Sequence, residues 1–192
     1  NFTPVIKDET FKMILTLAVL NKWKRYTIDI ETAFLYGNLS ELIYMTGPIG
    51  YKEIFEALVE DGVIEDANIH ELENDEILEL IKSIYRLVQA AREWYRKLWA
   101  KLLELEFNKC DNDLCLFHRS NELGTEILCV YIDDSFAVGV ERALEDTIKG
   151  LREDFTIVVN KNADEYLGCK IEDVGGKTVL PQPDILKRLR QR

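Results

Sequence analysis

The stretch Tyr131-Ile132-Asp133-Asp134 stands between two apolar runs, 126–130 and 135–140. Each run has the length of a strand, and the spacing of its apolar residues favours a β-hairpin over a helix. Two neighbouring carboxylates are therefore expected at the tip of a buried hairpin. Such a pair is costly there unless a positive charge lies against it, and a divalent metal ion is the usual solution. An Asp-Asp turn without a metal is the alternative.

A second aspartate has a similar setting upstream. Asp29 lies in the stretch Tyr26-Thr27-Ile28-Asp29-Ile30, which also has the length of a strand. Helices are predicted over 89–107 and 141–155, and a strand follows at 156–159. The order strand, helix, hairpin, helix, strand is a β-α-β-β-α-β, or split βαβ, arrangement. In such a sheet the first strand lies beside the hairpin, so Asp29 and Asp133 are predicted to be neighbours in space.

The rest of the chain offers further helices, strands and turns. In chain order the sequence predicts a helix over 8–22 capped by Asp8, an extended piece at 40–45, a helix over 51–62, a strand and turn within 77–87, strands at 114–118 and 166–171, a turn at 175–176 leading into 177–180, and a short basic helix that begins at Asp184.

Composition places the chain among ordinary soluble globular proteins, since 47% of its 192 residues are hydrophobic and 31% are charged. No apolar run approaches the roughly 20 residues of a membrane span, and residues 11–20 lack a signal-peptide cleavage site. The four cysteines show no CxxC spacing and the chain has two histidines, so free thiols in a reducing compartment are expected rather than a structural zinc site. Because the sequence opens on Asn1, we expect it to be cut from a longer chain.

The formal net charge of −11 argues against a nucleic-acid binder, which should carry a basic footprint. The acidity is local, however. Residues 53–79 hold eleven Asp and Glu and no Lys or Arg, and these eleven charges equal the net charge of the whole chain. We therefore expect a solvated acidic insert in an otherwise balanced protein. A regulatory or mimicry role for the insert is the alternative.

Two or three aspartates on adjacent strand ends suit a pair of Mg²⁺ ions ~3.5–4 Å apart. Mg²⁺ prefers carboxylate oxygens and leaves its remaining positions to water and phosphate. Such a site fits nucleotidyl transfer, in which catalysis is mostly positioning and charge stabilisation. It fits a nucleotide cyclase on the same kind of sheet equally well, so the fold alone does not decide between them.

Several segments carry a resemblance to a known family. In chain order they are TPV at 3–5, DIETAFLYG at 29–37 with IYM at 43–45, IYRLVQA at 84–90 with WY at 94–95, DLCLF at 113–117, YIDD at 131–134, YLGCKI at 166–171 and the stretch 181–189. They resemble the approach to motif A, motif A itself, motif B, the strand before the catalytic hairpin, motif C, the segment near the primer grip and the start of the thumb. The family is the reverse transcriptase of copia-type LTR retrotransposons.

The resemblance implies an α+β fold, the reverse-transcriptase palm, with a split βαβ, ferredoxin-like antiparallel sheet, helices on one face and partial fingers. It implies one fingers-palm domain over 1–192, with an acidic insert at 51–79 and the start of the thumb at 181–192. Two Mg²⁺ (or Mn²⁺) ions would be held by three catalytic carboxylates, Asp29, Asp133 and Asp134. The substrate-binding residues it implies are Ile30, Phe34 beneath the nucleotide sugar, Gln89 against the incoming nucleotide and Tyr131 against the primer end.

The activity implied is that of an RNA-directed DNA polymerase, which adds deoxynucleotides to a primer 3′ end within a retrotransposon polyprotein. Its partners would be an RNA or DNA template with primer, deoxynucleoside triphosphates, and RNase H and integrase from the same polyprotein, with no membrane. It would act inside the cell, in a cytoplasmic virus-like particle or the nucleus, and would not be secreted.

Two positions depart from the family pattern. The family usually has Gly where Arg86 stands and Lys where Val88 stands. Arg86 would obstruct the nucleotide pocket or supply a phosphate contact, and obstruction is favoured. With the acidic insert, these departures keep open a degenerate, catalytically inactive copy that acts as an interaction module. A metal-dependent nucleotide cyclase is the third reading, which the order of the motifs disfavours.

Overall fold

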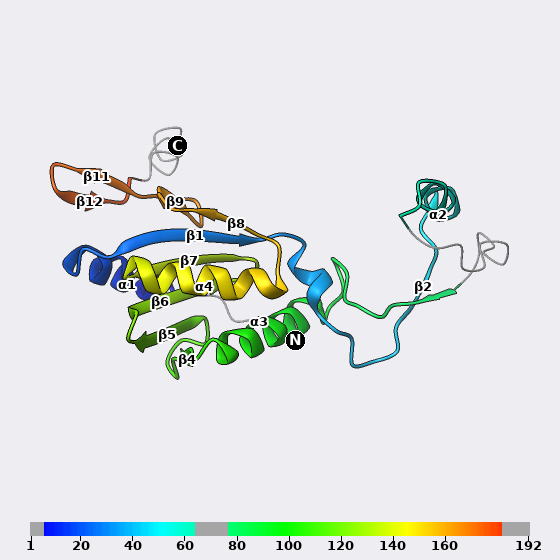
Figure 1. Cartoon of the computed structure of the whole chain (residues 1–192), viewed down its shortest axis with the longest axis horizontal. Helices are drawn as coiled ribbons and strands as arrows, with labels where there is room; N and C mark the ends of the chain where they lie inside the picture. Colours follow the sequence, from blue (N-terminus) through cyan, green and yellow to red (C-terminus); the bar gives the residue numbers. More distant parts are fainter. Residues whose placement is uncertain (1–5, 64–76, 182–192) are drawn as a thin grey trace, which may run out of the picture.

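The computed structural model describes residues 6–63 and 77–181. Its centre is a six-stranded antiparallel sheet (Figure 1). The strands, from one edge to the other, are β4 (Asn108–Lys109), β5 (Leu116–Asn121), β6 (Gly124–Tyr131), β7 (Asp134–Gly139), β1 (Lys24–Ile30) and β8 (Ile157–Asn160). The β6–β7 pair is the predicted hairpin, and β1 lies beside it.

Three longer helices flank this sheet: α1 (Asp8–Leu20), α3 (Ala90–Glu104) and α4 (Glu141–Asp154). The chain order β1, α3, β6, β7, α4, β8 and the sheet order β6-β7-β1-β8 agree with the predicted split βαβ arrangement. The strand β5 and the two-residue strand β4 extend the sheet beyond β6. The mixed α+β class and the antiparallel sheet predicted from sequence are therefore confirmed.

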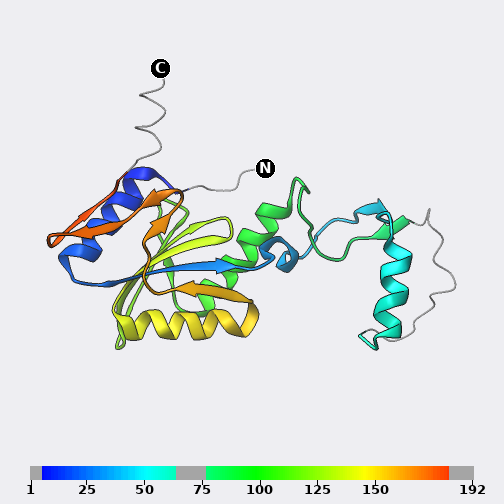
Figure 2. The ribbon, with the colours of Figure 1, turned by 90° about the horizontal axis from the view of Figure 1, so that it is seen from above.

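The two faces of the sheet bury separate hydrophobic clusters. On one face α3 contributes Trp94 and Leu98, and α4 contributes Leu144 and Ile148. The two residues of each helix are four positions apart, so they lie on the same side of that helix. On the other face the main contribution comes from α1, through residues such as Phe11. Figure 2 shows α1 and α4 on opposite sides of the sheet. The expectation of helices on one face thus holds for α3 and α4 but not for α1.

Several predicted boundaries need correction. Asp8 is the first helical residue of α1 and not its cap; it forms an ion pair with Lys12 one turn later. The strand predicted at 114–118 lies at Leu116–Asn121. The strand predicted at 166–171 is a tight hairpin of β9 (Glu165–Tyr166) and β10 (Cys169–Lys170). Leu167 and Gly168 form its turn with positive φ angles of 49° and 73°.

A smaller lobe extends away from the sheet (Figures 1 and 2). It contains the 3-10 helix η1 (Ala33–Tyr36) at its base, then β2 (Tyr44–Thr46), α2 (Tyr51–Glu60) and β3 (Ile77–Glu79), with β2 paired to β3. None of the residues of α2 is buried. The acidic insert begins in this lobe, but its segment 64–76 lies outside the described residues, as does the helix predicted from Asp184.

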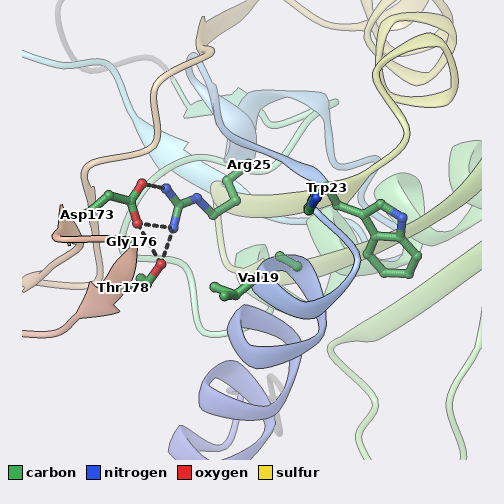
Figure 3. Close-up of a pocket in the computed structure, with 8 residues that line it drawn as sticks. Val19, Trp23, Arg25, Asp173, Gly176 and Thr178 are labelled. Atoms are coloured by element: carbon green, nitrogen blue, oxygen red, sulfur yellow. Dashed lines mark hydrogen bonds and ion pairs between the residues drawn. The ribbon is translucent and has the colours of Figure 1, made fainter.

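A C-terminal hairpin, β11 (Glu172–Val174) with β12 (Lys177–Val179), is attached to the beginning of β1. Arg25 forms an ion pair with Asp173, and the Thr178 hydroxyl donates to the same carboxylate at 2.5 Å (Figure 3). These side chains line a cavity of about 260 Å³ between α1, β1 and the hairpin. The Arg25–Asp173 pair therefore holds the hairpin against the end of β1 that lies far from Asp29.

None of the helices in the described part of the chain combines the length and the hydrophobicity that a bilayer span requires.

Candidate active site

The tip of the β6–β7 hairpin is a two-residue turn. Tyr131 pairs with Asp134, so Ile132 and Asp133 form the turn itself. Ile132 has a φ of 56°, in the left-handed region that a β-branched residue rarely occupies. Only contacts from the surrounding structure can hold such a residue there.

Two hydrogen bonds fix the carbonyl groups of this turn. The indole nitrogen of Trp94 on α3 donates to the Ile132 carbonyl oxygen at 2.6 Å. The backbone nitrogen of Ile30 donates to the Asp133 carbonyl oxygen at 3.1 Å. Since Ile30 directly follows Asp29, the Ile30–Asp133 bond joins the strand that carries Asp29 to the hairpin turn. The Trp94–Ile132 bond anchors this turn to the core.

The three predicted carboxylates are brought together at this end of the sheet. Asp29 lies directly opposite Asp134 in the β1–β7 register, and residues opposite each other in an antiparallel pair share a face. Ile28 and Ile30 point into the cluster under α3 and α4, so Asp29 and Asp134 lie on the other face. Asp133 adjoins them in the turn. Sequence reasoning correctly made neighbours of Asp29 and Asp133.

The pKa values of two of the carboxylates are raised by their surroundings. Partial burial raises the pKa of Asp29, and the charges of Asp133 and Glu31 raise it further. Partial burial likewise raises the pKa of Asp134, with added contributions from Asp133 and Asp29. The neighbouring charges therefore make ionisation of Asp29 and Asp134 harder, which is the situation that a bound cation would relieve.

The described residues supply no such cation. No ion pair formed within residues 6–63 and 77–181 includes Asp29, Asp133 or Asp134. In the same part of the chain, no group of three or more His, Cys, Asp or Glu side chains is arranged to hold a metal ion. The three carboxylates have the chemistry of a Mg²⁺ site, because Mg²⁺ prefers carboxylate oxygens as ligands. Their side chains, however, are not arranged around a common point that a metal ion could occupy.

Phe34 lies on η1, directly after the strand that carries Asp29. Its ring meets that of Tyr85 edge-on, with 4.9 Å between ring centres. The Ser83 hydroxyl donates to the Phe34 carbonyl oxygen. A Cβ at Gly37 would meet the Ser83 hydroxyl at 2.7 Å and the Trp94 backbone nitrogen at 3.1 Å, so Gly37 permits this close approach. Phe34 is thereby held against Ser83 and Tyr85, in the segment that leads into α3.

The other predicted substrate residues differ in how well they suit that role. Gln89 is half-buried at the N-cap of α3, and Tyr131 is half-buried at the end of β6. The side chain of Ile30 is 2% exposed and packs in the core on the face away from Asp29. A side-chain contact from Ile30 to a substrate is therefore not available, because strand alternation points it to the wrong face.

The two departures from the family pattern lie next to Gln89. Arg86 is exposed and has a φ of 74°, a conformation that favours Gly. Val88 is 69% exposed. The backbone at Arg86 has thus kept a conformation suited to Gly while carrying a long cationic side chain.

Trp94 is the residue whose role sequence analysis missed. Its place on the apolar face of a helix indicated only a core position. The available signal was the indole N–H, which needs an acceptor when it is buried. Here the acceptor is the carbonyl group of the strained residue Ile132.

Comparisons with known proteins agree on one family. The sequence model described as "Reverse transcriptase (RNA-dependent DNA polymerase)" matches residues 1–192. The chain is 32% identical over 195 residues to the "Retrovirus-related Pol polyprotein from transposon TNT 1-94" of Nicotiana tabacum, covering 100% of the chain and 13% of that protein. It is 28% identical over 174 residues to the corresponding polyprotein of transposon RE2 from Arabidopsis thaliana, covering 90% of the chain and 11% of that protein. No solved structure matches significantly.

Proposed function

The chain belongs to the reverse transcriptase (RNA-dependent DNA polymerase) family, and on this premise we propose that it is the fingers-palm part of a copia-type polymerase. The proposed reaction is nucleotidyl transfer to a primer 3′ end, with Asp29, Asp133 and Asp134 as the catalytic carboxylates. The pairing of Asp29 with Asp134 beside the Asp133 turn is the observation that supports it most directly.

Each proposed residue has a distinct task. Asp29, Asp133 and Asp134 would hold two Mg²⁺ or Mn²⁺ ions, which when bound activate the primer hydroxyl and neutralise charge on the leaving pyrophosphate. Exposure leaves Asp29 and Asp134 free to change rotamer as they gather around a metal. Trp94 and the Ile30 backbone keep the hairpin tip in place while they do so.

The substrate contacts follow from the same arrangement. Phe34, fixed by Ser83 and Tyr85, would lie beneath the nucleotide sugar, where a bulky ring excludes a 2′-hydroxyl. Gln89 would contact the incoming nucleotide, and Tyr131, on the same sheet face as Asp134, would lie against the primer end. The partners are thus deoxynucleoside triphosphates and a primed RNA or DNA template.

The relatives also suggest a larger context. The chain spans 13% and 11% of the two polyproteins it matches, so most of their length lies outside it. We propose that residues 1–192 form one domain, that residues 181–192 begin a thumb, and that RNase H and integrase come from the same polyprotein. The polyprotein would act inside the cell, in a virus-like particle or the nucleus.

A second candidate is an inactive retrotransposon-derived interaction module. Arg86 next to the proposed nucleotide site favours it, as does the exposed surface of α2 in the acidic lobe. In either case we expect this chain by itself to extend primers weakly or not at all. Processive extension by the chain alone would contradict that expectation.

Calorimetric titration with Mn²⁺, with and without a deoxynucleoside triphosphate, tests the proposal. Asp133→Asn removes one carboxylate charge from the cluster and should weaken binding about tenfold or more. Asp111→Asn is a matched control, because Asp111 is exposed and makes no ion pair within the described residues. If neither wild type nor Asp111→Asn binds Mn²⁺ more tightly than Asp133→Asn, the inactive module becomes the better reading.

A further inference from the structure

Tyr166, which packs on the β6–β7 hairpin, has a buried hydroxyl without a protein partner. Two buried side-chain polar atoms within the described residues have no hydrogen-bond partner, and one of them is the Tyr166 hydroxyl. Tyr166 is 4% exposed. Buried polar groups are nearly always paired, because leaving one unpaired destabilises the fold. The unpaired hydroxyl of Tyr166 therefore calls for an explanation.

The packing of Tyr166 shows which part of the sheet it covers. Its ring lies 5.2 Å from that of Phe136 and 5.3 Å from that of Phe11, measured between ring centres. Phe136 pairs with Cys129 across the β6–β7 hairpin. The next pair on the same face is Tyr131 with Asp134, about 7 Å further along the strands. A tyrosine ring over Phe136 can therefore bring its hydroxyl to the Asp134 pair.

The groups that interact with the Tyr166 hydroxyl come from the same part of the sheet. Burial is the main reason that the pKa of Tyr166 is raised, and the groups of Cys129, Asp134 and Tyr131 are among those that raise it further. A tyrosine hydroxyl can donate a hydrogen bond. Asp134 is the strongest acceptor among these groups, because thiols are weak acceptors and a carboxylate is a strong one.

We propose that Tyr166 is a positioning residue for nucleotidyl transfer, whose hydroxyl donates to the Asp134 carboxylate when the three aspartates gather around metal. This inference rests on the proposed function. In the present arrangement Asp134 is exposed and does not contact the hydroxyl. A change of the Asp134 rotamer toward the sheet would pair the hydroxyl and direct the second carboxylate oxygen toward Asp29.

Tyr166→Phe tests the inference, because it removes the hydroxyl alone. The matched control is Tyr26→Phe. Tyr26 is 1% exposed, lies in the cluster on the opposite face of the sheet, and donates through its hydroxyl to Glu145 at 3.1 Å. Both variants of the full chain are measured by Mn²⁺ calorimetry and by thermal unfolding without metal.

We expect Tyr166→Phe to weaken Mn²⁺ binding about tenfold, as loss of a hydrogen bond to a metal ligand does, while its unfolding midpoint without metal stays at or above that of wild type. Tyr26→Phe should lower the midpoint and leave Mn²⁺ binding unchanged. Equal Mn²⁺ binding by wild type and Tyr166→Phe would overturn the inference and leave the proposed function intact.

Two other outcomes would also overturn it. A fall in the metal-free midpoint of Tyr166→Phe as large as that of Tyr26→Phe would show that the hydroxyl already has a structural partner. Absence of any Asp133-dependent Mn²⁺ binding in wild type would remove the metal site itself, and the proposed function would then fail together with the inference.

Discussion

The indole nitrogen of Trp94 donates to the carbonyl oxygen of Ile132 at 2.6 Å, so a helix in the core directly holds the turn between the hairpin strands. Ile132 is the residue of that turn with a positive φ. The contact explains how the strained turn persists, since the surrounding structure over-determines its conformation. Because Asp133 follows Ile132 in the turn, the contact with α3 also fixes the position of Asp133.

Trp94→Phe should therefore destabilise the protein by about 2–4 kcal/mol, through the lost hydrogen bond and the cavity left in the core. Urea unfolding measures the loss. Trp99→Phe on the same helix is the control, because Trp99 is only half-buried and its indole nitrogen has no partner among the described residues. Equal losses in the two variants would show that the bond to Ile132 contributes nothing.

A second prediction concerns a buried ion pair between β5 and β6. Arg119 and Glu126 have side chains that are 5% and 2% exposed, and Arg119 also donates to the Leu105 carbonyl and the Thr147 hydroxyl. Arg119 also pairs with Asp146 at 3.0 Å, but that carboxylate is 44% exposed. Glu126→Leu therefore leaves the buried guanidinium only partly compensated and should cost about 2–3 kcal/mol. The double variant Arg119→Met/Glu126→Leu should recover most of that loss in urea unfolding. A double variant no more stable than Glu126→Leu would refute the explanation by uncompensated charge.

A third prediction concerns the pH dependence of the C-terminal hairpin. The hydrogen bond from Arg25 lowers the pKa of Asp173 below its ordinary value of 3.8, with a further contribution from Thr178. A depressed carboxyl pKa stabilises the fold above pH 3.8, and this stability is lost as the pH falls through the lower, folded-state value. Because Asp173 is largely exposed, the pair is worth only about 0.5 kcal/mol.

Thermal unfolding of wild type and Asp173→Asn between pH 7 and pH 3 checks this. The midpoint of Asp173→Asn should be lower at pH 7, and the two midpoints should converge as the pH falls below the ordinary carboxyl pKa of 3.8. Asp111→Asn should match wild type throughout this range. A constant difference between Asp173→Asn and wild type at all pH values would exclude the ion pair as its cause.

Local periodicity predicted the parts of the site that lie within strands. The alternation on either side of Asp133 and around Asp29 has a period of two, and the split βαβ order then requires their segments to pair. The turn at Leu167 and Gly168 was missed because Leu is an unusual residue at a positive φ and the flanking apolar residues suggested one strand.

Features that depend on tertiary contacts could not be predicted from the sequence. The apolar stripe of α1 indicates that it packs, but not on which face of the sheet, since both faces are apolar. Likewise, the family resemblance implied Ile30 as a substrate-binding residue. Its side chain points to the face away from Asp29, because adjacent strand residues alternate between faces. The bond from Trp94 to Ile132 joins residues far apart in the chain, and no local pattern encodes it.

The last prediction concerns Arg86, whose left-handed backbone costs about 1 kcal/mol that a glycine would avoid. Arg86→Gly should leave the free energy of unfolding in urea unchanged or slightly higher. The exposed side chain loses no buried contact, and the greater entropy of unfolded glycine offsets part of the gain.

If Arg86 obstructs the proposed nucleotide site, Arg86→Gly should bind a deoxynucleoside triphosphate more tightly in the presence of Mn²⁺. The control variant is Arg86→Asn, because asparagine also tolerates a positive φ. An exposed arginine elsewhere, such as Arg142, would not serve, because a glycine there would disturb helix α4. Weaker nucleotide binding by both Arg86 variants would show instead that the guanidinium contacts the phosphates.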